Sequence, residues 1–247
     1  MRRLGMLVGT LLVIAGCTVA FWQRSVNIAY AELGRQVLTD STDIFEGDSD
    51  AEQSCGSLDW DALTRQNQDA VAWVEVDGTD ISLPVVEARA DDRSYYLTHD
   101  IWGRPALEGT PFLDHRCGAD GTHRLVYGHH LATGGQFSEL QRTYEQEVFG
   151  RLGTCHWHTP EKGATAMRPL CALRVDMRYG QIQTFDFPDS EGLHRWLSEL
   201  EGAASARSVD AALLASKAAS ALTLVTCSSD LAWQPWRTIV VFVETSE

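Results

Sequence analysis

Apolar residues follow three patterns along this chain, and each pattern predicts a different kind of structure. An unbroken apolar run covers 4–22 at the N-terminus. Apolar and polar residues alternate on both sides of Asp77-Gly78, in AVAWVEVDGTDISLPVVE, which indicates two strands joined by a tight turn. Apolar residues recur at helical spacing over 190–200. The chain therefore combines an apolar N-terminus with a region of strands and a few helices.

The chain beyond residue 57 is expected to contain many short strands. A first helix over 57–67 would be capped by Ser57 or Asp59. Strand and helix do not alternate as they would in a parallel α/β sheet, so the pattern predicts a mostly β fold, a largely antiparallel barrel with appended helices. Further strands are expected over 110–114, 124–127, 154–159, 168–178, 221–226 and 236–243, and further helices over 137–149, 190–200 and 209–218.

The apolar run 4–22 contains no charged residue and follows two arginines. As a helix it would reach roughly 28 Å, close to the hydrocarbon thickness of a bilayer. The arginines favour a cytoplasmic N-terminus, which places the rest of the chain outside the cell. We therefore expect a membrane anchor or signal segment over 1–26, and we favour an uncleaved single-pass anchor.

Two alternatives to an uncleaved anchor stay open for this segment. Ile14-Ala15-Gly16-Cys17 resembles the lipobox of bacterial lipoproteins, in which Cys17 would become the lipidated first residue. A signal peptide would instead be removed altogether. The apolar sequence continues past Cys17, where lipoproteins usually turn polar, and this favours the anchor. All three alternatives place the domain outside the cell.

An acidic segment separates the apolar run from the expected domain. The pattern over 27–38 indicates a helix that leaves the membrane. Eight acidic residues and no basic residue lie within 36–64. Such a run is typical of a solvated spacer. We therefore expect an acidic stalk over 27–56 and a folded domain over 57–247.

Composition and charge exclude several classes of protein. Of the 247 residues, 44% are hydrophobic and 22% are charged, which is typical of globular proteins. The formal net charge of −14 has the wrong sign for a protein that binds nucleic-acid phosphates. The six cysteines include no C-x-x-C pair, so a structural zinc site and a thioredoxin-like site have no support. They are also too sparse for a disulfide scaffold.

Two pairs of residues bear on metals and disulfides. His156 and His158 alternate on one expected strand, but no third ligand follows at a suitable spacing, so we expect no metal and no cofactor. Cys155 and Cys171 flank two strands that could form a hairpin. These cysteines could pair outside the cell, but their spacing leaves this open.

Candidate chemistry gathers where expected strands begin and end. Cys227 ends the strand 221–226, and Arg237 opens the next strand. A hairpin would bring the two residues together, and the guanidinium would then favour a thiolate and could stabilise an oxyanion. His129 follows a strand that stops at Gly128, where we expect the glycine to let the backbone turn. Each residue alone also fits a buried core thiol or a structural histidine.

In their order along the chain, these residues resemble the class B sortases, which are cysteine transpeptidases of Gram-positive cell surfaces. The resemblance covers 58–243. It rests on the blocks DWDALTRQNQDAVAWVEVDGTDISLPVV, SYYLTHD, EGTPFLDHR, LVYGHH with GGQFSEL, and LTLVTCSS with WRTIVVFVE. It implies a sortase-like closed barrel of about eight strands with N-terminal helices. The helical stretch 190–218, just before the cysteine strand, is similar to the insertion that marks class B.

The resemblance also implies a role for each matching residue. Cys227 would be the nucleophile, His129 the general acid/base, and Arg237 the stabiliser of the oxyanion or substrate. His130 stands where the family usually has a polar residue such as Asn. The positions that look groove-lining are Leu97 and Thr226.

The family's reaction is implied for this chain as well. The thiolate would attack a carbonyl in the C-terminal sorting signal of a secreted protein, and the histidine would protonate the leaving amine. An amine of a cell-wall peptide or of a pilin would then resolve the thioester. The sorting motif and the choice of acceptor stay open. A membrane anchor would hold the enzyme beside both substrates at the outer leaflet.

Other classes fit the chain less well. Papain-like peptidases place the catalytic Cys before the His, whereas here His129 precedes Cys227. The chain also lacks the S-H-G-C run of L,D-transpeptidases and the Q-A-C-x-G motif of caspase-like enzymes. A surface-anchored barrel that binds a ligand without catalysis is the alternative from another class. Rapid thiol labelling that depends on Arg237 would favour the enzyme.

Overall fold

The computed structural model describes Thr18, Phe21 and residues 24–39, 57–131, 134–228 and 234–245. Its main strands are β3 (Ala70–Val76), β4 (Ser82–Glu87), β5 (Phe112–Leu113), β6 (His123–Tyr127), β7 (Cys155–Thr159), β8 (Gly163–Asp176), β9 (Ala206–Arg207), β10 (Ala218–Cys227) and β11 (Trp236–Thr245).

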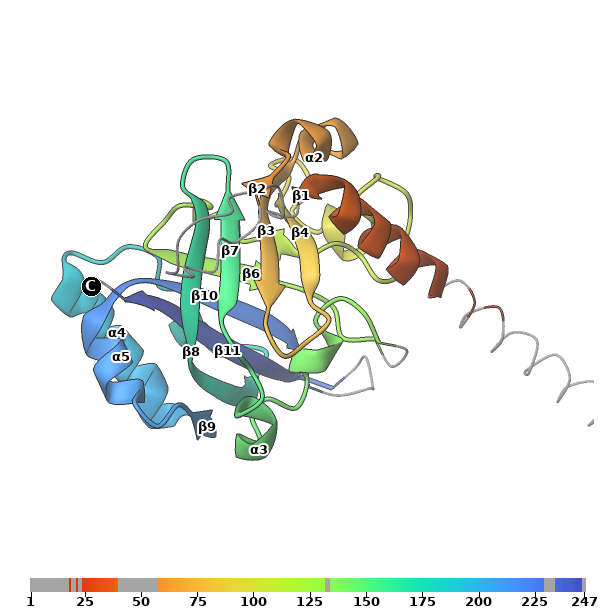
Figure 1. Ribbon diagram of the computed structural model, residues 1–247. Helices are drawn as coiled ribbons and strands as arrows, with labels where there is room; N and C mark the ends of the chain where they lie inside the picture. The colour runs from red at the N-terminus through yellow and green to blue at the C-terminus, as the bar shows by residue number, and fades with distance from the viewer. Residues whose placement is uncertain are drawn as a thin grey trace, which may run out of the picture.

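Among the described residues, eight strands close into a barrel (Figure 1). Their order is β11-β10-β6-β5-β4-β3-β7-β8, and the pairing of β11 with β8 closes the ring, while β9 extends β8 outside it. Two pairings, β4 with β5 and β6 with β10, are parallel, and the others in the ring are antiparallel. The predicted fold class, a mostly β closed barrel, is confirmed.

Large apolar side chains fill the barrel. Trp157 and Phe242 are at most 1% exposed. Strands β10 and β11 bury most of their positions, on both faces, because helices cover the face that points away from the interior. A strand covered on both sides reads as a continuous apolar run, and this explains why 221–226 and 236–243 were readily recognised.

The first hairpin and the first helix of the domain form as the sequence predicts. At Gly78 the backbone turns with φ +82°, and a Cβ there would collide with the carbonyl oxygen of Arg151. Only glycine fits such a position. Helix α2 (Trp60–Gln66) begins at Asp59, whose Oδ1 accepts a hydrogen bond from the Ala62 N–H at 2.8 Å. Asp59, and not Ser57, is therefore the N-cap.

A helix over 24–37 precedes the barrel, as predicted for 27–38, but it packs on the domain instead of leading away from it. Its buried side chains recur every three or four residues, and they are Val26, Tyr30, Leu33 and Val37. Strand β1 (Leu38–Thr39) then pairs with β2 (Ser57–Leu58). The first part of the predicted stalk is thus in contact with the barrel, and 40–56 lies outside the described residues.

Most of the apolar run 4–22 also lies outside the described residues. Within the part of the chain that the structure describes, no helix is both long and apolar enough to cross a bilayer.

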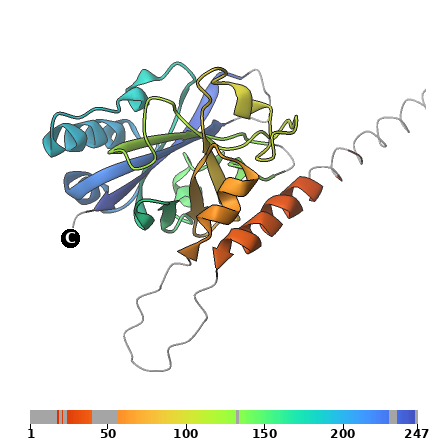
Figure 2. The same cartoon turned by 90° about the horizontal axis from the view of Figure 1, so that it is seen from above.

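The predicted helical insertion before β10 is present. It consists of α4 (Ser190–Ala203), β9 and α5 (Ala211–Lys217), and the two helices lie together beside the barrel (Figures 1 and 2). Asp189 caps α4 by accepting from the Gly192 N–H at 2.8 Å. The residues of α4 that were recognised by their helical spacing are the ones it buries, namely Leu193, Trp196, Leu197 and Leu200.

The prediction of one continuous helix over 137–149 is wrong. The segment forms only the short helices η2 (Ser138–Leu140) and α3 (Gln146–Phe149), with turns between them. The Ser138 hydroxyl donates to the Gly135 carbonyl, and the Thr143 hydroxyl donates to the Leu140 carbonyl at 2.8 Å. Such bonds from side chain to backbone compete with a continuous helix.

The possible pairing of Cys155 with Cys171 is not made. Both are free, buried thiols. On their strands Cys155 lies opposite Met167, whereas Cys171 lies opposite Arg207 and Val241.

Candidate active site

Two parallel strands end side by side at the candidate site. Tyr127 of β6 lies opposite Val225 of β10, and the Gly128 N–H donates to the Val225 carbonyl at 3.0 Å. His129 and Cys227 each follow two residues after this last strand pair. The parallel pairing therefore directs both residues out of the same end of the barrel.

Cys227 and Arg237 lie directly opposite each other on β10 and β11. Opposed residues of an antiparallel pair have Cα atoms about 4.5–5.5 Å apart and side chains on the same face of the sheet. The predicted proximity of Cys227 and Arg237 is therefore present in the strand register.

Exposure distinguishes Cys227 from the other cysteines that the structure describes. Cys227 is partly exposed, whereas Cys117, Cys155 and Cys171 are buried. Burial raises the pKa of Cys117 to about 11 and that of Cys171 to about 12, and it raises the pKa of Cys155 further. These three thiols are inert core residues, because the reactive form of cysteine is the thiolate.

The Arg237 side chain is held by backbone carbonyls of residues just before it in the chain. Its Nη1 donates to the carbonyl oxygens of Gln234 at 3.3 Å and Trp236 at 3.0 Å. These bonds keep the guanidinium at the loop end of the hairpin, next to the end of β10 that carries Cys227. A guanidinium carries five N–H donors, so it has further donors to offer an incoming carbonyl.

His129 is oriented by a backbone carbonyl. Its Nε2 lies 2.9 Å from the carbonyl oxygen of Leu97, at the end of η1 (Tyr95–Leu97). A carbonyl only accepts, so Nε2 carries the proton, and Nδ1 is the acceptor of the neutral ring. Leu97, predicted to line a groove, has a side chain that is 39% exposed, and its carbonyl orients the imidazole.

Two glycines shape the surroundings of His129. Gly109 has φ +57°, and a Cβ there would lie 3.1 Å from His129 Cδ2. Gly128 was expected to allow a turn, but its φ is not positive. Its role is close packing, because a Cβ at Gly128 would lie 2.7 Å from Cγ of the buried Phe137 ring.

Comparison of the sequence with curated proteins points to one enzyme family. No family model matches the chain. Sortase B of Listeria monocytogenes is 21% identical over 198 residues, which are 78% of each chain. Sortase B of Staphylococcus aureus is 22% identical over 142 residues, which are 57% of each chain. The chain is a relative of the class B sortases.

Solved structures show that the fold is the sortase fold. Sortase B of Bacillus anthracis, in complex with AAEK1, superimposes with a TM-score of 0.69 at 20% identity, covering 93% of this chain and 100% of that chain. Sortase B of Clostridium perfringens gives a TM-score of 0.65 at 22% identity, covering 75% of this chain and 99% of that chain. The resemblance inferred from the sequence is confirmed, and the relatives support a sortase-type cysteine transpeptidase.

One predicted groove residue of this sortase relative does not fit that position. Thr226 is 2% exposed, and it points to the opposite face of β10 from Cys227 because side chains alternate along a strand. Its Oγ1 is buried without a hydrogen-bond partner. His130, next to His129, forms an antiparallel bridge with Gln136, so its backbone helps to close the loop between them.

The sequence did not indicate Arg174 of β8 as a neighbour of the site. Its guanidinium lies 5.2 Å from the ring centroids of both Tyr144 and Trp236. The Arg174 Nε donates at 3.5 Å to Oγ of Ser228, the residue that directly follows Cys227. Arg174 therefore ties the residue that follows the thiol to a third strand. Finding it required the register of β8 against β11, which no local pattern contains.

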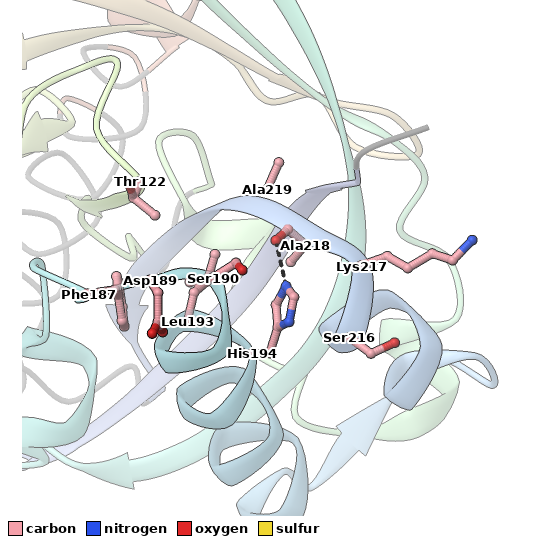
Figure 3. Close-up of a pocket in the computed structure, with 10 residues that line it drawn as sticks. All are labelled: Thr122, Phe187, Asp189, Ser190, Leu193, His194, Ser216, Lys217, Ala218 and Ala219. Carbon is pink, nitrogen blue, oxygen red and sulfur yellow. Dashed lines mark hydrogen bonds between the residues drawn. The ribbon is translucent and has the colours of Figure 1, made fainter.

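Two hollows lie elsewhere on the sortase barrel. One, of about 510 Å³, lies between the N-terminal end of α4 and the junction of α5 with β10 (Figure 3). There Asp189 caps α4, and His194 Nε2 donates to the Ala218 carbonyl at 3.0 Å. The other, of about 1180 Å³, lies between the helix 24–37 and the β3–β4 hairpin. Neither is lined by the candidate site residues.

The paired histidines of β7 make structural contacts. His158 Nε2 lies 3.0 Å from Glu75 Oε2, and His156 Nε2 lies 3.3 Å from Asp77 Oδ2. The hydrogen bond from His158 lowers the pKa of Glu75, and a weaker hydrogen bond from Ser82 acts in the same direction. Together they outweigh the burial of Glu75, which alone would raise its pKa. Across the described ranges, no group of three or more His, Cys, Asp or Glu side chains could hold a metal ion.

Proposed function

We propose that this sortase relative cleaves the C-terminal sorting signal of secreted proteins through a thioester on Cys227. It then transfers the acyl group to an amine of a cell-wall peptide or of a pilin. One observation carries the proposal. The partly exposed thiol lies opposite Arg237 and at the same barrel end as His129, in a sortase fold.

Each of the three residues has a distinct task in this reaction. The Cys227 thiolate attacks the scissile carbonyl, and Arg237 donates hydrogen bonds to the oxygen that becomes negative. His129, held through Nε2 by the Leu97 carbonyl, takes the Cys227 thiol proton at Nδ1 as the thiolate forms and then delivers it to the leaving amine. In the second half-reaction His129 takes a proton from the attacking amine, and the thioester is replaced by an amide.

Names of solved relatives support both kinds of substrate. One solved structure is a substrate complex of S. aureus sortase B, and another is a sortase B complexed with triglycine. For this chain the sorting signal and the acceptor amine are part of the proposal.

We further propose that 4–22 anchors the enzyme in the cell membrane, with a cytoplasmic N-terminus and an extracellular barrel. The uncharged apolar run behind two arginines supports this topology. Lipidation at Cys17 is the alternative, and it gives the same location for the barrel. An anchored enzyme would meet both its secreted and its wall substrates at the outer leaflet.

The test is cleavage of a peptide library by the detergent-solubilised full chain, followed by mass spectrometry. We expect a thioester adduct on Cys227 and, with an added amine, a transpeptidation product. Cys227→Ala should remove both, whereas Cys117→Ala, a matched change of a buried thiol, should keep both. Turnover that survives in Cys227→Ala would refute the nucleophile assignment.

A further inference from the structure

Tyr30 joins the N-terminal helix to the loop beside His129. It lies in the helix 24–37 and is 3% exposed. Its Oη accepts from the Ile101 N–H at 3.2 Å, and it lies 3.4 Å from the Gly109 carbonyl oxygen and 3.3 Å from Thr110 Oγ1. One hydroxyl group therefore holds both ends of the loop between Ile101 and Thr110.

Gly109 connects this hydroxyl group to the imidazole by direct packing. A Cβ at Gly109 would lie 3.1 Å from His129 Cδ2 and 3.1 Å from the Leu97 carbonyl carbon. The Gly109 carbonyl also accepts from Gln136 Nε2 at 3.3 Å. Gly109 is thus held by Tyr30 and Gln136, and it packs against His129 and against the residue that orients His129.

The backbone conformation of Gln136 shows that the surrounding structure imposes the contact between Gln136 and Gly109. It is 7% exposed and has φ +48°, and it is the one non-glycine residue with positive φ in the described part of the chain. Such a conformation persists only where neighbouring structure determines it. The bridge to His130 and the bond from the Phe137 N–H to the His129 carbonyl, at 3.1 Å, supply that constraint.

We propose that Tyr30 is a positioning residue for His129. Its hydroxyl group fixes the Gly109 segment, so that the Leu97 carbonyl holds the imidazole in the Nε2–H tautomer with Nδ1 presented to the substrate. This inference rests on the proposed function only for the catalytic role of His129. The N-terminal helix is then a supporting part of the active site.

The protonation state of Tyr30 agrees with this role. Burial raises its pKa to about 12, so the hydroxyl group keeps its proton over the working range of pH. It can therefore act both as an acceptor from Ile101 and as a donor to the loop.

The test compares Tyr30→Phe with Val37→Ala in the full-length chain. Val37, fully buried on the same helix, controls for loosened packing of that helix, and its backbone carbonyl still accepts from the Asp59 N–H. We expect Tyr30→Phe to lower kcat by about 10-fold or more with little change in KM, because the imidazole is misplaced. Nitrogen-15 NMR of the imidazoles should show His129 as a mixture of tautomers. Val37→Ala should lower the melting temperature and leave kcat and the tautomer unchanged.

Gln136→Asn provides a second variant if Tyr30→Phe does not fold. Asparagine tolerates positive φ, but its shorter side chain withdraws the amide donor from Gly109, so the same changes are expected. A wild-type tautomer and kcat in folded Tyr30→Phe would overturn the proposal, and so would the same result in folded Gln136→Asn. An equal loss of kcat in Val37→Ala would overturn it as well. If the wild-type chain cleaves no peptide, the proposed function fails, and the NMR comparison alone decides the positioning role.

Discussion

Gly128→Ala is the sharpest test of how the barrel supports the candidate site. The new Cβ would lie 2.7 Å from Phe137 Cγ and 2.8 Å from Phe137 Cε2, whereas carbon atoms pack at about 3.5–4.0 Å. The neighbouring ring must therefore move by roughly 1 Å. Phe137 is fully buried, so it cannot rotate into solvent. Overpacking of this kind typically costs about 1–3 kcal/mol of unfolding free energy.

The same displacement should reach the chemistry, because His129 is the next residue. A shift of about 1 Å in a positioned group can lower turnover by about 100-fold. We would measure urea unfolding and peptide cleavage for Gly128→Ala and for Gly180→Ala, where a Cβ would meet nothing within 4 Å. The control should lie within about 0.5 kcal/mol of wild type. Wild-type stability and turnover in Gly128→Ala would refute the packing argument.

Three further predictions follow from other parts of the structure. Arg237→Lys keeps the charge but loses the planar fork, so turnover should fall about 100- to 1,000-fold, mostly in kcat, and near-normal steady-state kinetics would refute the oxyanion role. Burial lowers the pKa of His123 from 6.5 to about 4, so the neutral ring contributes about 3 kcal/mol of stability above pH 6.5 that is lost as the pH falls to 4. Urea unfolding at both pH values should show this loss in wild type and its absence in His123→Gln. Gly202→Ala in α4, where a Cβ meets nothing within 4 Å, should raise the unfolding free energy by about 0.5 kcal/mol, and a decrease in thermal unfolding would contradict it.

The sequence predicted the half of the candidate site that depends on one hairpin. Cys227 and Arg237 terminate apolar strands joined by a short connection, and the hairpin register places them opposite each other. His129 was assigned from the family resemblance. The strand before it pairs with β10 in parallel, and strands about a hundred residues apart leave no local pattern that identifies their pairing.

Support for His129 was missed because it depends on contacts distant in sequence. The acidic residues within 36–64 favoured a stalk, yet Val26, Tyr30, Leu33 and Val37 recur at helical spacing and are buried. That periodicity was a readable sign of a packed helix. Thr226 was also misplaced, although alternation from Cys227 indicates that it faces the other way.

The two halves of the site therefore differ in what holds them. Cys227 and Arg237 lie on long strands whose hydrogen bonds continue through the barrel, so displacing them requires breaking the sheet. His129 lies beyond the last pair of β6, and loop carbonyls, two glycines and a helix hydroxyl group set its position. Changes that break the strand pairing should therefore lower stability and activity together, unlike Arg237→Lys, which changes only a side chain. Changes around Gly109 and Tyr30 should lower activity more than stability, and this difference is measurable in the variants described above.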